Sequence, residues 1–119
     1  GARLLLVEDD FFIRLDLESI LENAGAKLVG CCASVDEALE LLEEEHGIDA
    51  AVLDVRLGST TVASVADRLS ALRIPFLFYT GQVQGDATLA KWPDRPVLAK
   101  PALPGSIISM VASVMRRGN

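Results

Sequence analysis

Two kinds of hydrophobic pattern alternate along this chain. Short continuous apolar runs are followed by longer stretches in which apolar residues recur three and four positions apart, and no segment repeats. Continuous runs are typical of parallel strands buried on both faces, whereas the wider spacing is typical of helices with one buried face. The pattern predicts five strands, at residues 3–7, 27–32, 50–53, 75–79 and 96–99.

Helices are expected between and after these strands. The first spans residues 11–24 and is followed by Gly25, a residue type favoured just beyond a helix end. The second opens on a capping box, in which Ser34 is followed three positions later by Glu37, and it ends near His46. Further helices are expected around 62–72 and 107–115, a polar loop at 55–60, and at most a short fourth helix within 82–95.

This alternation of strands and helices predicts an α/β fold. Right-handed crossovers predict a five-stranded parallel sheet with helices on both faces. Of the possible arrangements we choose the flavodoxin-like (βα)5 three-layer sandwich, with strand order 2-1-3-4-5 and a shortened or irregular fourth helix. A chain of 119 residues buries about two thirds of the surface that it exposes when unfolded, which is enough for one core. We therefore expect a single domain over residues 1–119.

Composition narrows the function classes. The chain has 11 Lys and Arg against 17 Asp and Glu, so it lacks the basic face with which proteins bind nucleic acid. Its apolar runs fall far short of the roughly 20 residues of a membrane span, and no secretory signal is expected. Cys31 and Cys32 are adjacent, which makes a disulfide between them strained, so the expected location is the reducing cytoplasm.

Polar residues stand at the ends of four predicted strands. Glu8 and Asp9 follow the first strand, Asp54 the third, Thr80 the fourth and Lys100 the fifth. In open parallel sheets, ligands bind outside the carboxyl ends of the strands, where the strand order reverses. Carboxylates packed closely repel one another unless a cation joins them, and hard oxygen ligands suit Mg2+. A Mg2+ pocket is therefore predicted between the first and third strands.

Each of these residues also has an ordinary structural interpretation. A carboxylate after a strand is usually a helix N-cap or a loop residue, and Asp10 is expected to cap the first helix. Asp54 alone would be ordinary at a strand end, but Thr80 and Lys100 stand at the matching ends of the next two strands. Pro101 allows the peptide bond before it to be cis, which would point Lys100 inward. The combination favours a functional site.

The ordered set of motifs resembles the receiver domain of response regulators in two-component signalling, and the resemblance covers the whole chain. The motifs are the acidic pair after the first strand, Asp54 after Ala-Val-Leu, Thr80 after Phe-Tyr, and Lys100-Pro101 after Val-Leu-Ala. The resemblance implies that Asp54 accepts a phosphoryl group from a histidine kinase or a histidine phosphotransfer protein. The domain would then change conformation and control a downstream protein, with no enzymatic activity beyond its own phosphorylation and dephosphorylation.

The resemblance also implies a role for each site residue. Mg2+ on one side and Lys100 on the other would offset the charge of the phosphoryl oxygens. The Thr80 hydroxyl would swing toward the phosphoryl group and move the loop that follows it. The protein ligands of Mg2+ would be Asp9 and Asp54 directly, Glu8 through water, and Arg56 through its backbone carbonyl.

Departures from the common receiver pattern narrow the subtype. Val97 stands where most receivers have an aromatic switch residue, and the interval from Asp54 to Lys100 is short for the family, in agreement with a reduced fourth helix. Together with Phe78 and Gly81, these features are similar to the FAT GUY receivers, which are named for a Phe-Ala-Thr-Gly motif.

The match to this subgroup is partial. Tyr79 replaces the alanine of the motif, and neither Gln82 nor Val83 supplies the aromatic residue that follows it. In the FAT GUY subgroup the usual partners are histidine kinases of the HWE/HisKA2 type, often in bacterial stress signalling. The resemblance therefore implies, as a hypothesis, that a kinase of this type is the phosphodonor of the present chain.

Arg56, Gly81 and Pro101, through its possible cis bond, are expected to modulate the site, and an apolar set on the first helix is a candidate docking surface. Arg56, two residues after the phosphoacceptor, is expected to tune the lifetime of the phosphoryl group by contacting or shielding it. Gly81 either leaves a path for the donor imidazole or is only a flexible loop residue. Phe11, Phe12 and Leu15 form an apolar set on the first helix, which either docks the phosphodonor or packs against neighbouring loops.

The sequence also allows other functions, namely an enzyme, a pseudo-receiver and a phosphate shuttle or sink. A haloacid-dehalogenase-type enzyme also uses a strand-end Asp with Mg2+, but it needs a second Asp where this chain has Arg56. A pseudo-receiver, which binds partners without being phosphorylated, usually lacks the phosphoacceptor, the Lys or the acidic pair, and all are present here. A phosphate shuttle or sink is a further alternative, and a homodimer is compatible with the sequence.

Overall fold

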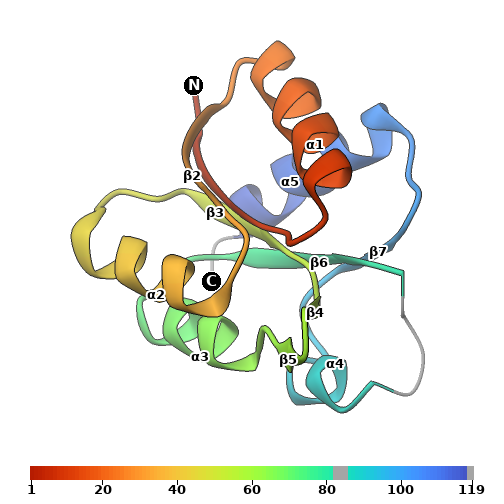
Figure 1. The fold of residues 1–119 in the computed structure, drawn as a ribbon. Helices are drawn as coiled ribbons and strands as arrows, with labels where there is room; N and C mark the ends of the chain where they lie inside the picture. Colours follow the sequence, from red (N-terminus) through yellow and green to blue (C-terminus); the bar gives the residue numbers. More distant parts are fainter. Residues whose placement is uncertain (82–85, 118–119) are drawn as a thin grey trace.

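The computed structural model describes residues 1–81 and 86–117 and contains one five-stranded parallel sheet (Figure 1). The strands of this sheet are β1 (Arg3–Val7), β2 (Lys27–Cys32), β3 (Ala50–Leu53), β6 (Phe76–Thr80) and β7 (Val97–Ala99). Their order is β2-β1-β3-β6-β7. β6 and β7 are the predicted fourth and fifth strands, because β4 (Arg56–Leu57) and β5 (Thr60–Thr61) form a separate two-stranded hairpin. The observed order is therefore the predicted order 2-1-3-4-5.

Helices cover both faces of the sheet. α1 and α5 lie on one face, and α2 and α3 lie on the other (Figure 1). The resulting three layers confirm the flavodoxin-like sandwich. The helices of the described residues are α1 (Phe11–Asn23), α2 (Val35–Glu44), α3 (Ala63–Ala71), α4 (Ala87–Lys91) and α5 (Pro104–Arg117).

Two apolar cores lie on opposite faces of the sheet. Along β1, Leu5 and Val7 pack with α2 and α3, whereas Leu4 and Leu6 pack with α1 and α5. This alternation follows from the two-residue period of a strand. β1 is also paired on both sides, with β2 and β3, so none of the four side chains is more than 1% exposed. The site at the end of β1 therefore stands on a rigid support.

The local signals at the helix ends are confirmed. The Asp10 carboxylate accepts a hydrogen bond from the Ile13 N–H at 3.0 Å and caps α1. At the start of α2, the Ser34 hydroxyl accepts from the Glu37 N–H at 3.2 Å and lies 3.3 Å from the Glu37 carboxylate. Gly25, with φ of +96°, turns the chain out of α1 into β2.

The prediction of a polar loop at residues 55–60 is wrong. β4 (Arg56–Leu57) and β5 (Thr60–Thr61) form a short antiparallel hairpin there. Leu57 is only 4% exposed and belongs to the core under α2 and α3. Gly58, at φ of +64°, makes the turn between the two strands. The sequence did not reveal this hairpin, because Leu57 is surrounded by polar residues and two-residue strands are too short to show a hydrophobic period.

Two helix ends also differ from the predicted ones. α2 ends at Glu44 instead of near His46, because Glu45 is already extended with ψ of 141°. α3 begins at Ala63, because the N–H of Val62 donates to the carbonyl of Val55 and ties this residue to the hairpin.

The expected short fourth helix is present. α4 has five residues, and Trp92 directly after it packs against Phe76 and Phe78 with ring centroids 6.3 and 6.4 Å away. These aromatic contacts cover part of the sheet beside the short helix. Within residues 1–81 and 86–117, none of the helices combines the length and apolar character that crossing a membrane requires.

Candidate functional site

Backbone hydrogen bonds extend the sheet by one residue at its carboxyl edge. The N–H groups of Glu8 and Asp54 donate to carbonyls of neighbouring strands, both at 2.9 Å. The N–H of Lys100 donates in the same way to the carbonyl of Thr80 at 3.0 Å. The strand ladders therefore position the backbone from which the predicted site residues project.

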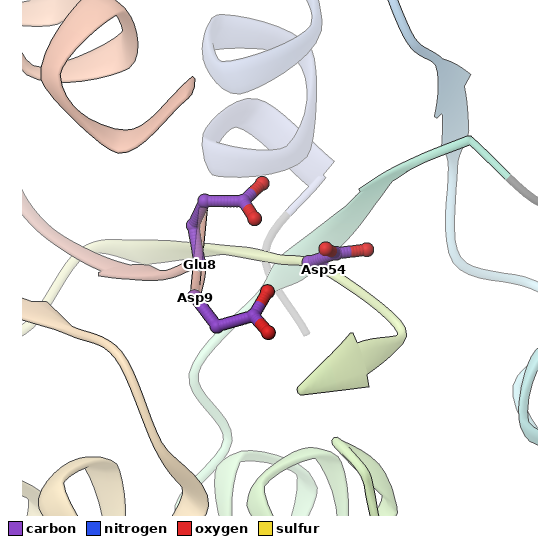
Figure 2. Close-up of side chains that lie close together, drawn as sticks. All are labelled: Glu8, Asp9 and Asp54. Atoms are coloured by element: carbon purple, nitrogen blue, oxygen red, sulfur yellow. The ribbon is translucent and has the colours of Figure 1, made fainter. Parts of the chain in front are cut away.

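Three carboxylates gather at the ends of β1 and β3 (Figure 2). One carboxylate oxygen from each of Glu8, Asp9 and Asp54 lies within 4.8 Å of the others. Glu8 is 2% and Asp54 8% exposed, whereas Asp9 is exposed and accepts a hydrogen bond from the Gly58 N–H at 2.8 Å. The β4–β5 turn thus holds one member of the acidic cluster.

The Lys100 ammonium group lies between two of these carboxylates. Its Nζ is 2.6 Å from the Glu8 Oε1 atom and 3.0 Å from the Asp54 Oδ2 atom. The lysine side chain is only 15% exposed, so both ion pairs are shielded from water. The peptide bond between Lys100 and Pro101 is cis. The structure therefore brings together the basic and acidic residues that stand at three separate strand ends.

Burial and neighbouring charges shift the protonation equilibria of this group. Burial raises the pKa of Glu8 above its ordinary value, and the Asp54 charge adds to this, although Lys100 acts in the opposite direction. Burial lowers the pKa of Lys100, but the hydrogen bonds to Glu8 and Asp54 outweigh it, so the net shift is upward. Lys100 is therefore a cation at neutral pH.

The donor set fits a divalent cation. Among the described residues, Glu8, Asp9 and Asp54 are the one group of three potential metal-ligating side chains that lie this close together. In the part of the chain that the structure describes, Lys100 is the one cation within ion-pair distance of these carboxylates, so the cluster has excess negative charge. Carboxylate oxygens are the ligands that Mg2+ prefers, and its charge would relieve their repulsion.

Thr80 and Gly81 stand beside this cluster. Thr80 is the last residue of β6, is 2% exposed, and pairs with Ala99 of β7. At Gly81, no atom of the described residues lies within 4 Å of the point where a Cβ would stand. The two positions that distinguish the chain from the FAT GUY motif beyond this glycine, Gln82 and Val83, lie outside the described residues.

Arg56 makes a contact that sequence reasoning missed. Its guanidinium is 3.8 Å from the Asp86 Oδ2 atom, and the arginine side chain is 58% exposed, whereas that of Asp86 is 2% exposed. Asp86 is the N-cap of α4, and its Oδ1 atom accepts from the Thr88 N–H at 2.8 Å. A cap signal was present at Asp86, but nothing in the sequence connects it with Arg56.

Tyr79 is a second residue that the sequence did not single out for the site. Its hydroxyl accepts a hydrogen bond from the Ala102 N–H at 3.1 Å, just after the cis peptide bond. The Lys100 ammonium lies 5.8 Å from the centre of the tyrosine ring. Tyr79 thus supports the turn that carries Lys100, in the place where the FAT GUY motif has alanine.

The comparison with known families agrees with this geometry. Residues 4–112 match the response regulator receiver domain. The chain belongs to this family. The receiver shares 25% identity over 117 residues with the phyllosphere-induced regulator PhyR of Methylorubrum extorquens, a match that covers 97% of this chain and 44% of PhyR.

The chain is also similar to a second curated protein and to a solved receiver structure. The transcriptional regulatory protein PdtaR of Mycobacterium tuberculosis is 29% identical over 113 residues, which are 94% of this chain and 54% of PdtaR. The receiver therefore spans about half the length of these curated relatives. The solution structure of SdrG from Sphingomonas melonis Fr1 has 38% identity and a TM-score of 0.81, over 96% of both chains.

Proposed function

We propose that this receiver accepts a phosphoryl group on Asp54 in a Mg2+-dependent reaction and switches conformation to control a partner protein. The observation that carries the proposal is the arrangement around Asp54. One of its oxygens is 3.0 Å from the Lys100 ammonium, and its carboxylate belongs to the cluster with Glu8 and Asp9. A nucleophilic carboxylate between a cation site and a lysine is suited to phosphoryl transfer.

Each residue of the site has a defined task in this proposal. Asp9 and Asp54 would hold Mg2+ directly, Glu8 through water, and Arg56 through its backbone carbonyl. When bound, Mg2+ supplies positive charge that offsets the phosphoryl oxygens during transfer. An Asp54 oxygen attacks phosphorus, the bond from phosphorus to the donor imidazole breaks, and Lys100 contacts an oxygen of the transferred group.

The response to phosphorylation would begin at Thr80. A phosphoryl group on Asp54 adds charge and three acceptor oxygens next to the end of β6. The Thr80 hydroxyl can then donate to one of them, which draws the segment after β6 toward the site. Gly81 would leave the approach open for the imidazole of the donor, in keeping with the space around it.

The phosphodonor we propose is a histidine kinase of the HWE/HisKA2 type or a histidine phosphotransfer protein. The Pro-Phe-Leu-Phe-Tyr-Thr-Gly segment around β6 and the five-residue α4 support a FAT GUY-type receiver. Phe11, Phe12 and Leu15 on α1 are 56%, 78% and 51% exposed next to the acidic pair, which suits docking of donor helices. We further propose that residues 1–119 form one receiver unit and that it acts in the cytoplasm.

The test is incubation with Mg2+ and acetyl phosphate, followed by intact mass. Wild type is expected to gain one phosphoryl group and Asp54→Asn none. Asp67→Asn, which removes an exposed carboxylate on α3, is the matched control and is expected to react like wild type. With beryllofluoride, amide NMR shifts are expected near Thr80 and Lys100. No mass gain in wild type would contradict the proposal and favour a pseudo-receiver.

A further inference from the structure

The hairpin after the phosphoacceptor is joined to the start of α4 by an ion pair. Arg56, in β4, reaches across to Asp86, which caps α4, with 3.8 Å between the guanidinium Nη2 and the Oδ2 atom (Figure 1 shows the hairpin beside α4). The two residues are 30 positions apart, and they belong to segments that share no strand pairing. Arg56 is therefore a link between the phosphorylation site and α4.

The two oxygens of Asp86 have different tasks. Oδ1 accepts the capping hydrogen bond from the Thr88 N–H at 2.8 Å. Oδ2 is buried and makes no hydrogen bond within the described residues, so the guanidinium at 3.8 Å is the charge that faces it. A buried carboxylate that loses a cation facing it is destabilised, and the helix turn that it caps is destabilised with it.

The arginine, in contrast, can leave this contact easily. Its side chain is 58% exposed and its distance from Asp86 is beyond hydrogen-bond range, so little holds it there. A phosphoryl group on Asp54, two residues before Arg56, carries about two negative charges and three acceptor oxygens. Arginine binds such a group through two parallel hydrogen bonds, which are stronger than a single long ion pair.

We infer that Asp86 is a positioning residue that competes with the phosphoryl group for the Arg56 side chain, so that phosphorylation of Asp54 withdraws Arg56 from Asp86 and loosens the start of α4. This inference rests on the proposed function. It has two consequences. The lifetime of phosphorylated Asp54 depends on Asp86 through Arg56, and α4 responds to phosphorylation through the same arginine.

The variant Asp86→Asn separates charge from capping. Asparagine keeps an oxygen that accepts from the Thr88 N–H, but it no longer attracts the guanidinium. Arg56 is then free to shield the phosphoryl group, so hydrolysis of phosphorylated Asp54 is expected to slow by about two- to fivefold, as expected for one partly exposed ion pair. Arg56→Gln removes the shield, and hydrolysis is expected to be faster than in wild type.

The decisive measurement is the decay of the phosphorylated mass in four proteins: wild type, Asp86→Asn, Arg56→Gln and the double variant. Asp86→Asn is expected to slow decay when Arg56 is present and to have no effect when it is Gln. Equal effects of Asp86→Asn in both backgrounds, or none in either, would overturn the inference. Asp67→Asn controls for the change in net charge.

Beryllofluoride with Mg2+ gives an independent readout. Amides of α4, such as those of Thr88 and Leu89, are expected to shift in wild type and much less in Arg56→Gln, while Thr80 and Lys100 shift in both. Full α4 shifts in Arg56→Gln would overturn the inference and leave the proposed function intact. Absence of shifts at Thr80 and Lys100 in wild type would overturn both.

Discussion

At the scale of single residues, the Lys100 ammonium decides how two buried carboxylates are tolerated. Glu8 is 2% exposed and Asp54 8%, and both contact the lysine at 3.0 Å or less. Burying charges is unfavourable unless they are paired. The lysine thus supports the folded state, because it offsets repulsion in the same cluster that is proposed to bind Mg2+.

Replacement of Lys100 by Met is expected to lower the free energy of unfolding by about 3 kcal/mol at pH 7.5 without Mg2+, because two buried carboxylates lose their cation. The loss shrinks on acidification. Glu8 has a raised pKa in the folded protein, so the native state holds a proton that the unfolded state releases, and stability falls as the pH rises above the ordinary value of 4.5.

Urea unfolding of Lys100→Met at pH 5 and pH 7.5 measures this effect. Lys27→Met, at an exposed lysine in β2, is the matched control and is expected to change stability little at either pH. If Lys100→Met were as stable as wild type at pH 7.5, the buried ion pairs would not support the fold.

At the scale of elements, the β4–β5 hairpin is the part of the molecule that connects the site with its surroundings. Its turn residue Gly58 donates to Asp9, its strand residue Leu57 enters the core, and its exposed Arg56 contacts Asp86. Three consecutive residues of the hairpin therefore contact the acidic cluster, the core and α4. The hairpin is suited to pass a change at Asp54 to other elements.

The conformation of Gly58 can be tested directly. Its φ of +64° lies in the left-handed region, and no described atom lies within 4 Å of an added Cβ, so Gly58→Ala introduces backbone strain without a clash. We expect a loss of about 1 kcal/mol in the free energy of unfolding, measured with urea.

Gly105→Ala is the matched control for this prediction. Gly105 lies in the first turn of α5, also with open space at the Cβ position, but without a positive φ. Alanine favours helix over glycine, so this variant is expected to be as stable as wild type or more stable. A stable Gly58→Ala would show that the turn adopts another conformation in solution.

At the scale of the whole molecule, the site lies at the carboxyl edge of a sheet that has an apolar core on each face. Residues of β1 and β3 alternate between the core under α2 and α3 and the core under α1 and α5. The strands that carry Glu8 and Asp54 are thus held from both faces. A ligand that binds this site only in the native state therefore adds its binding free energy to the stability of the fold.

Mg2+ is therefore expected to raise the melting temperature of the receiver. At a concentration one hundred times its dissociation constant, a ligand that binds only the native state adds about 2.7 kcal/mol. Thermal unfolding over a range of MgCl2 concentrations, at constant ionic strength, measures the gain. Asp9→Asn is expected to lose most of it, whereas Asp36→Asn at the start of α2 keeps it. An equal gain in Asp9→Asn would place the ion elsewhere.

Much of the fold was predictable because it rests on local patterns. Buried strands showed as apolar runs, and Asp10 and Ser34 marked the starts of α1 and α2. The hairpin and the end of α2 were not predictable in this way. Leu57 is drawn into the core by packing, Glu45 is already extended after α2, and at the start of α3 Val62 is held by a backbone hydrogen bond to Val55, none of which leaves a period in the sequence.

Apolar periodicity and crossover handedness predicted a five-stranded parallel sheet and the types of residue at each strand end, and they left few strand orders to choose from. Which of these residues touch one another depends on the folded chain. Lys100 lies between Glu8 and Asp54, Tyr79 supports the turn after Lys100, and Arg56 faces Asp86. Such contacts join segments far apart in the chain, and they depend on side-chain packing, which no local pattern encodes.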